Sequence, residues 1–321
     1  GGISWYKTHE DYIDNLFYSY GYYFGEIRID GSNPDKVYTM GVPMIKSDDG
    51  GKNWKSIDYP NMHGDHHALW VNPNRTGHMI AGNDGGLNIT YDDGENWMKY
   101  NSTSVGQFYD INIDMKKPYN VYGGFQDNGV WMGPSDYESS MRWHSTGQYP
   151  WKFIFGGDGM QTEVDFRDNE TVYTGSQFGN YARLNTRTGE RKRITPTHKL
   201  GERPYRWNWE TPIYLSRHQQ DILYMGSNKF HRSLDKGNYF ETLSGDLTKG
   251  GIKGNVSYGT LTTIMESPLK FGLIYVGSDD GLVHVSHDGG NTWKNISSSL
   301  PNNMWISSVY PSKFYQNRVY V

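Results

Sequence analysis

Histidines and carboxylates are concentrated between residues 63 and 86, in the stretch "HGDHHALWVNPNRTGHMIAGNDGG". Imidazole and carboxylate groups serve as metal ligands and as general acids or bases. His63, Asp65 and His66 lie in a polar segment and not at the helical spacing that favours a zinc site. The pattern therefore predicts no transition metal, but it leaves calcium open because oxygen-rich turns can bind that ion.

Similar polar clusters recur further along the chain. Aspartates precede glycine or Asn-Gly in four short segments, and one segment carries a basic and two aromatic side chains: Asp84 in "GNDGG", Asp127 in "FQDNG", Asp158 in "GGDGM", Asp280 in "SDDG", and Arg206, Trp207 and Trp209 in "YRWNWE". Turn geometry alone explains any single Asp-Gly pair. Paired carboxylates are also the groups that hydrolyse glycosidic bonds, and aromatic rings stack on sugars.

A repeat of 42 to 51 residues organises the elements that position these groups. In each unit, a strand of alternating polar and apolar residues is followed by a polar loop and a second, apolar strand. One position of the second strand, usually Tyr, marks the repeat: Tyr38, Ile80, Tyr122, Tyr173, Tyr224, Tyr275 and Tyr320. Several short strands per unit at this period are typical of a β-propeller, in which each unit is one four-stranded blade. We therefore expect an all-β propeller.

A second motif, Ser/Thr-x-Asp-x-Gly-x-x-Trp, follows the third strand of several units. It occurs at 47–54, 90–97 and 286–293, and at 233–240 with Phe in the last place. We expect its Ser and Asp side chains to bond backbone amides across the turn between the third and fourth strands. Glycine supplies positive φ, and the aromatic ring packs between blades. We interpret these aspartates as structural.

The repeat also predicts the domain organisation. Residues 1–321 form one propeller with six complete blades, at markers Tyr38 to Tyr275. Two inner strands at the C-terminus and one outer strand at residues 1–5 supply a split seventh blade. The alternative expectation is that the sequence is a fragment of a larger protein, for example of a ten-bladed ring.

Strand parity places the polar clusters together. In an antiparallel blade, the loop entering the first strand and the loop joining the second and third strands emerge at the same edge. We therefore expect one loop edge to contain the following residues: His63, Asp65, His66, Asp84, Asp127, Asp158, Arg206, Trp207, Trp209 and Asp280.

Composition excludes several other classes of function. The net charge is −4 and no long basic run occurs, so nucleic acid is not an expected partner. No apolar stretch approaches the roughly 18 residues of a membrane span. The first residues lack the features of a signal peptide, and the absence of cysteine excludes disulfides and thiol chemistry.

The repeated Ser/Thr-x-Asp turn resembles the Asp-box, or BNR repeat, of sialidases, sortilins and two-propeller xyloglucanases. From about residue 25 onward the chain is similar to a group of secreted bacterial proteins called glycosyl-hydrolase-like or sortilin N-terminal-like. The stretches that carry this resemblance include "HGDHHALWVNP", "GNDGGLNITYDDGENW", "GGFQDNGVW" and "YVGSDDGLVHVSHDGGNTWKNIS". The resemblance implies a bacterial protein that is secreted or at the cell surface.

The resemblance also implies two alternative activities. Sortilin-like proteins bind peptides, whereas the xyloglucanases cleave β-glucans by inversion with paired aspartates. Asp84 in "NDGGL" is similar in setting to one xyloglucanase aspartate, although the turn is one residue shorter. The arginine triad of sialidases does not assemble here.

From these observations we expect a propeller that binds a glycan or a peptide at the loop edge through His63, Asp65, His66, Arg206, Trp207, Trp209 and Asp280. The alternative is an inverting glycoside hydrolase that uses two of Asp84, Asp127 and Asp158 as acid and base. We expect no cofactor, although the oxygen-rich turns leave calcium binding open. If the full-length protein is longer than this sequence, we expect it to contain further domains.

Overall fold

The structure is a computed structural model that describes residues 2–13, 16, 21–58, 62–100, 105–138, 140–141 and 150–321. The chain divides into two compact units, Gly1–Val105 and Gly106–Val321, which are considered separately. The described helices are one turn at α1 (Gly21–Phe24) and the 3-10 turn η1 (Ser297–Ser299), and none is long and apolar enough to span a membrane.

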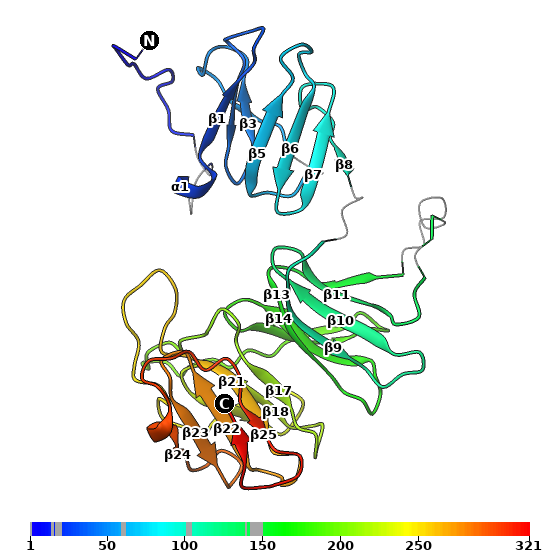
Figure 1. Cartoon of the computed structure of the whole chain (residues 1–321), viewed down its shortest axis with the longest axis vertical. Coiled ribbons are helices and arrows are strands. Elements are labelled where there is room, and N and C mark those ends of the chain that lie inside the picture. The colour runs from blue at the N-terminus through cyan, green and yellow to red at the C-terminus, as the bar shows by residue number, and fades with distance from the viewer. Residues whose placement is uncertain are drawn as a thin grey trace. The chain divides into compact units, whose positions relative to one another are not determined.

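The first unit contains two four-stranded antiparallel sheets in its described residues (Figure 1). Their strands follow one another in chain order: β1 (Glu26–Ile29), β2 (Val37–Met40), β3 (Ile45–Ser47) and β4 (Lys55–Ser56), then β5 (His66–Val71), β6 (Met79–Asn83), β7 (Gly86–Thr90) and β8 (Met98–Tyr100).

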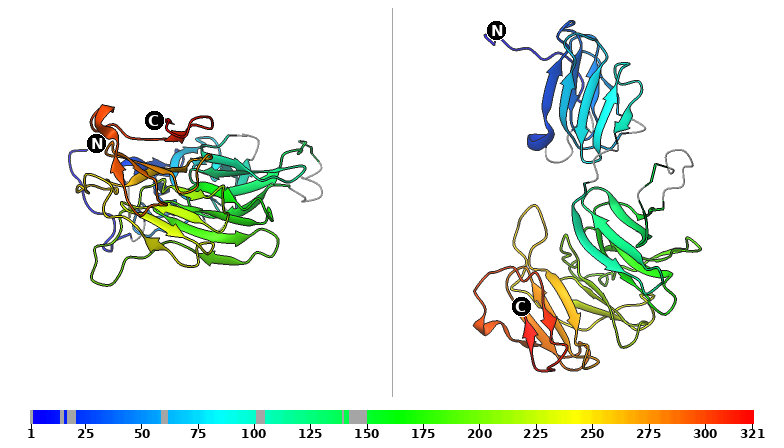
Figure 2. Two further views of the ribbon diagram at one scale, coloured as in Figure 1. Left: turned by 90° about the horizontal axis from the view of Figure 1, so that it is seen from below. Right: turned by 45° about the vertical axis from the view of Figure 1, so that its right-hand side comes forward.

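The second unit repeats the same topology in four further sheets, followed by a two-stranded one. Figure 1 and Figure 2 show these sheets succeeding one another from green to red. The strands are β9 (Phe108–Ile113), β10 (Asn120–Phe125), β11 (Gly129–Pro134) and β12 (Lys152–Phe155); β13 (Gly159–Val164), β14 (Thr171–Ser176), β15 (Asn180–Asn185) and β16 (Arg191–Arg193); β17 (Ile213–Leu215), β18 (Leu223–Gly226), β19 (Phe230–Ser233) and β20 (Glu241–Thr242); β21 (Leu261–Glu266), β22 (Ile274–Ser278), β23 (Val283–Ser286) and β24 (Lys294–Asn295); and β25 (Tyr310–Pro311) and β26 (Val319–Tyr320).

The predicted marker lies in the second strand of every sheet. Tyr38, Tyr122 and Tyr224 are fully buried, and each phenol reaches a carboxylate: the hydroxyls donate to Asp93, Asp114 and Glu266 respectively. A tyrosine suits this position because its ring fills the space between sheets while its hydroxyl finds a partner. The all-β fold with four-stranded propeller blades is confirmed, whereas the number of blades in the whole ring stays a prediction.

Apolar side chains meet between successive blades of a unit. In the second unit, one cluster combines Tyr224 and Phe230 of the β17–β20 blade with Ile264 and Val276 of the β21–β24 blade. Second strands such as β14 are buried on both sides, with only the end residues partly exposed. Face-to-face burial of this kind explains why these strands are almost continuously apolar.

The four Ser/Thr-x-Asp turns have the predicted geometry. In the first, Ser47 Oγ accepts the N–H of Gly51 at 2.8 Å and donates to Asp49, whose Oδ1 accepts the N–H of Asn53 at 2.9 Å. The same bonds recur around Thr90, Ser233 and Ser286. These carboxylates are therefore occupied by their own turns.

The closing aromatic residues of three of these turns pack towards the preceding blade, as predicted. Trp97 is buried, and its Nε1 donates to the carbonyl of Ile57 at 2.6 Å. The Trp293 ring lies 5.0 Å from Phe230, and Phe240 packs against the cluster that contains Ile194.

Candidate functional site

The β10–β11 turn and the segment that enters β13 are joined by a hydrogen-bond network. Asp158 Oδ1 accepts the backbone N–H of Asp127 at 2.7 Å and the side-chain amide of Gln126 at 3.1 Å. Gln126 Nε2 also donates to Asp127 Oδ1 at 2.9 Å. The structure thus brings Asp127 and Asp158 together, as strand parity predicts.

The two aspartates of this network differ in their surroundings. Asp158 is 7% exposed, and its own N–H donates to Gln177 Oε1 at 3.1 Å. Asp127 is only partly buried and adopts positive φ (60°), a conformation that Asp tolerates better than most residues. Asp158 therefore holds the turn in place, and Asp127 is the more exposed of the two residues.

Two residues not identified from the sequence complete the network. Trp209 Nε1 donates to the Tyr109 hydroxyl at 2.8 Å, and that hydroxyl donates to Gln126 Oε1. Burial raises the pKa of Tyr109, and the nearby Asp158, Glu210 and Asp127 carboxylates add to the increase, while the Trp209 bond opposes it. The phenol is therefore a stable donor. Gln126 lies within the "FQDNG" segment but is uncharged, and Tyr109 lies in β9, where no sequence signal pointed to it.

Trp209, one of the two predicted aromatic residues, belongs to this network through its bond to Tyr109. Its indole packs edge-on against Phe178 at 5.2 Å, and its carbonyl accepts the N–H of Phe178 at 3.2 Å. These contacts fix the ring between the β13–β16 and β17–β20 blades and leave it half-buried.

Arg206 and Trp207 have other neighbours. The Arg206 guanidinium bonds Asp246 at 2.7 Å and the carbonyl of Gly259 at 3.0 Å, so it closes the long 245–259 loop. Trp207 stacks on His231 with a centroid distance of 5.5 Å and lies against the α-carbon of Gly179, where an added Cβ would meet the indole at 2.9 Å. These contacts support structural packing, and a ligand-binding role for either residue stays a prediction.

Asp280 lies in the β22–β23 turn and is 2% exposed. Its Oδ1 accepts from the Ser278 hydroxyl and its Oδ2 accepts the N–H of Lys249, both at 2.6 Å. The neighbouring Asp279 accepts the N–H groups of Gly259 and Thr260, and burial raises the pKa of Asp279. This turn therefore uses its carboxylates to anchor the 245–259 loop.

In the first unit, the turn after β6 and the segment before β5 come together. His67 Nε2 and Asp84 Oδ1 are 2.7 Å apart, and carboxylate oxygens of Asp65 and Asp84 lie within 4.8 Å of each other. His63 packs on Gly85, where an added Cβ would lie 2.6 Å from the His63 Cβ. His67, which was not among the predicted ligand residues, thus faces Asp84. Calcium binding here stays a prediction.

His66 is fully buried, unlike the other residues of this segment. Its Nε2 lies 2.9 Å from Asp58 Oδ2, and the same oxygen accepts the N–H of Met44 at 2.9 Å. Burial tends to raise the pKa of Asp58, but hydrogen bonds from His66, Ser56 and Met44 outweigh it and lower that pKa. His66 therefore has the contacts of a core residue, and its ligand role stays a prediction.

A further group of carboxylates lies on or beside the first strands of the second unit and had no sequence signal. Burial raises the pKa of Glu163 on β13 to about 7; Arg217 opposes this rise and Asp110 adds to it. Burial also raises the pKa of Asp110 on β9 and of Glu210 before β17. Gln161 and Thr162 precede Glu163 in β13, so no alternation of polar and apolar residues in this strand could predict the partial burial of Glu163.

No protein-family model matches the chain, and no curated protein matches it either. Among solved structures, it is similar to a GH74 enzyme of Niastella koreensis, with 13% identity over 87% of this chain and a TM-score of 0.32. The chain spans 60% of the length of that enzyme.

Two further structures show comparable similarity. YCF48 bound to D1 peptide is 12% identical, with 89% of this chain and 87% of that chain covered and a TM-score of 0.42. The extracellular domain of a putative one-component system from B. thetaiotaomicron is 12% identical, with 90% and 36% covered and a TM-score of 0.42. At this level the similarities assign neither an activity nor a ligand to the chain.

Proposed function

We propose that this protein is a ligand-binding β-propeller that binds a glycan through the β10–β11 turn and the residues joined to it. The observation that carries the proposal is the network of Asp127, Gln126, Asp158, Tyr109 and Trp209. It fixes a partly exposed carboxylate and an amide beside a half-buried indole. Carboxylates and amides bond sugar hydroxyls, and aromatic rings supply apolar contact area.

We also infer that the four Ser/Thr-x-Asp turns group the chain with the Asp-box proteins, and that the protein acts outside the bacterial cell. The support is the hydrogen bonding of the turns, which recurs at all four positions. Sortilin-like membership rests on the sequence resemblance alone.

The alternative, an inverting glycoside hydrolase, needs two carboxyl groups about 6.5–9.5 Å apart, with space for a water molecule between them. The Oδ1 atoms of Asp127 and Asp158 are at most about 6 Å apart, because both accept hydrogen bonds from the same Gln126 nitrogen at 2.9 and 3.1 Å. Asp158 Oδ1 is also engaged with a backbone N–H. This pair therefore favours binding over inversion, and a catalytic pairing that involves Asp84 stays a prediction.

The test is calorimetric titration of the protein with cellohexaose, a xyloglucan heptasaccharide and a pool of unrelated peptides, combined with an assay for new reducing ends. We expect an oligosaccharide to bind without cleavage. Asp127→Asn should weaken that binding about ten-fold, the loss of one hydrogen bond to a charged group. Asp235→Asn is the matched control, because Asp235 is occupied by its own turn.

The other outcomes identify different functions. New reducing ends that disappear in Asp127→Asn would establish a hydrolase. Binding of peptides but of neither oligosaccharide would establish a peptide receptor. Either result would overturn the proposal of a glycan-binding protein.

A further inference from the structure

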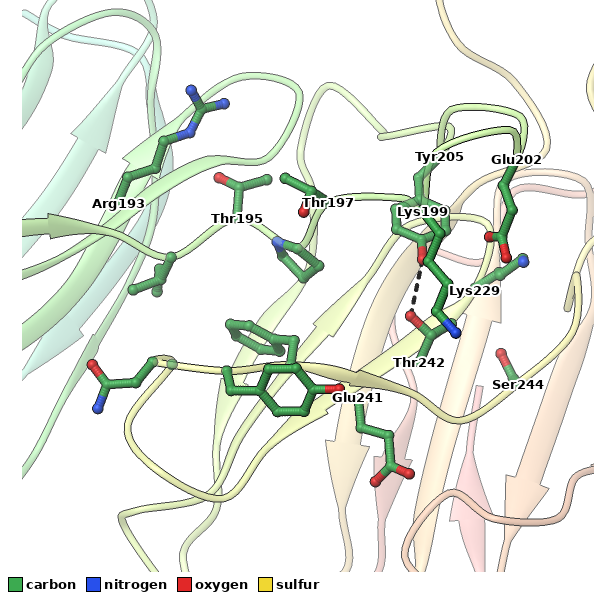
Figure 3. Close-up of a pocket in the computed structure, with 16 residues that line it drawn as sticks. Arg193, Thr195, Thr197, Lys199, Glu202, Tyr205, Lys229, Glu241, Thr242 and Ser244 are labelled. Atoms are coloured by element: carbon green, nitrogen blue, oxygen red, sulfur yellow. Dashed lines mark hydrogen bonds between the residues drawn. The ribbon is translucent and has the colours of Figure 1, made fainter.

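A cleft of about 590 Å³ lies on the β17–β20 blade, and none of its lining residues belongs to the Asp127 network. One wall is the segment from Arg193 to Tyr205, and the other is formed by Lys229 in the β18–β19 turn, the β19–β20 hairpin and Ser244 after it. Figure 3 shows Arg193 at one end and Lys199, Lys229 and Glu202 grouped at the other. The volume is in the range of small-molecule sites.

The floor of the cleft is polar and fixed by contacts inside the blade. The Tyr205 hydroxyl and Thr242 Oγ1 are 3.0 Å apart, as the dashed line in Figure 3 marks. Thr242 Oγ1 lies 3.0 Å from Nδ1 of the buried His231, and Nε2 of that histidine lies 2.7 Å from Ser227 Oγ. Burial lowers the pKa of His231 to about 3, so the imidazole is neutral and this chain of hydrogen bonds holds Tyr205 in place.

The charges that line the cleft are unbalanced. Among the described residues, Arg193, Lys199 and Lys229 form no ion pair with a carboxylate. Glu241 is 3.5 Å from Arg232, which leaves Glu202 as the one lining carboxylate without a cationic partner. The cleft thus has excess positive charge at both ends, and Thr195 and Thr197 supply hydroxyls between them.

We propose that this cleft binds an acidic oligosaccharide whose sugar units carry carboxylates. Cations at both ends match carboxylates repeated along a chain, because charge-assisted hydrogen bonds to carboxylates are the stronger ones. The threonine hydroxyls match the sugar hydroxyls, and the rings of Tyr205 and Tyr239 offer apolar contact area. This site is separate from the glycan site at the Asp127 network, and the proposal does not depend on that site.

The test is titration calorimetry of the whole chain with trigalacturonate, with its fully methyl-esterified form, and with tetraglutamate. We expect trigalacturonate to bind at least about ten-fold more tightly than the ester, since esterification removes the charges. Binding should weaken between 50 and 500 mM salt because ions screen exposed charges.

Two substitutions give opposite effects. Lys229→Gln should weaken trigalacturonate binding about ten-fold, whereas Glu202→Gln should strengthen it, because the remaining repulsive carboxylate is lost. Lys313→Gln is the matched control, since it makes the same charge change outside the cleft. Asp127→Asn should leave this binding unchanged, which separates it from the glycan site proposed above. Unfolding midpoints establish that each variant is folded.

Four results would overturn the proposal. They are absence of trigalacturonate binding to the folded protein, equal binding of acid and ester, equal affinity of the wild type and Lys229→Gln, and tighter binding of tetraglutamate than of trigalacturonate. The last result would assign the cleft to an acidic peptide.

Discussion

The β10–β11 and β22–β23 turns join the second and third strands of their blades, and both carry aspartate close to glycine. In the β22–β23 turn, Asp280 is buried, and its two oxygens accept from the Ser278 hydroxyl and from the N–H of Lys249 in the 245–259 loop. In the β10–β11 turn, the buried acceptor is Asp158 from the next segment, and Asp127 stays partly exposed.

This difference shows how one sequence pattern serves two purposes. A carboxylate that accepts a backbone N–H of a neighbouring loop, as Asp280 does from Lys249, anchors that loop and has little capacity left for a ligand. A turn that is held by a carboxylate from a neighbouring segment can direct its own aspartate outward. The comparison therefore separates anchoring aspartates from candidate binding ones.

The largest loss of stability is expected for the substitution of Asp279, which lies beside Asp280. Asp279→Ala leaves the N–H groups of Gly259 and Thr260 and the Thr260 hydroxyl without their acceptor. The free energy of unfolding should fall by about 3 kcal/mol, because unsatisfied buried donors are costly. Urea unfolding measures this. A loss below about 1 kcal/mol would show that the β22–β23 turn does not depend on its carboxylates.

The second-largest loss of stability is expected for Asp158→Ala. Asp158→Ala removes the acceptor for the Asp127 N–H and one of the two acceptors of the Gln126 side-chain amide, so stability should fall by about 2 kcal/mol. Hydrogen exchange at the Asp127 amide should accelerate at the same time. Asp158→Asn retains a side-chain oxygen and should lose less. If the exchange rate of the Asp127 amide is the same in Asp158→Ala and the wild type, Asp158 does not stabilise the β10–β11 turn, and the two turns do not differ in the way described.

Glu163 extends the comparison to a carboxylate on a strand. Its pKa is raised from 4.5 to about 7, chiefly by burial, so the folded state binds more protons than the unfolded state between these values. The free energy of unfolding should therefore fall as the pH rises from about 4.5 to about 7, by roughly 1–2 kcal/mol after allowance for partial exposure of the side chain.

Urea unfolding at several pH values measures this dependence, and Glu163→Gln should flatten it over that interval. A profile that is the same in Glu163→Gln and the wild type would show that the carboxylate ionises in the folded state near its ordinary pKa.

The smallest effect on stability is expected at Asp127. Asp127→Asn retains an oxygen for Gln126 and tolerates the positive φ of this position, so stability should change by less than about 0.5 kcal/mol. Thermal unfolding measures this. A decrease of 2 kcal/mol would class Asp127 with the anchoring aspartates.

The sequence predicts the fold more completely than it predicts the site. The marker positions, six tyrosines and Ile80, locate the second strand of each described sheet, because burial between blades imposes a regular pattern on the chain. Strand parity then brings Asp127 next to Asp158, and Asp84 next to His67 and Asp65. These results depend on local periodicity, which a single sequence contains.

The remaining contacts depend on side chains from distant segments. Arg206 bonds Asp246, which is 40 positions away, and Tyr109 meets Trp209 across 100 positions. No periodicity specifies such pairs, because their partners come from segments far apart in the chain. For the same reason, the burial of His66 and the raised pKa of Glu163 could not be predicted.

The central claim is that Asp127 binds ligand whereas Asp280 holds structure. The most direct measurement is the affinity for the oligosaccharide that binds the wild type, together with the unfolding midpoint, in Asp127→Asn and Asp280→Asn. We predict that Asp127→Asn loses about ten-fold in affinity at an unchanged midpoint, and that Asp280→Asn lowers the midpoint at an unchanged affinity. Equal affinity in Asp127→Asn and the wild type would contradict the claim.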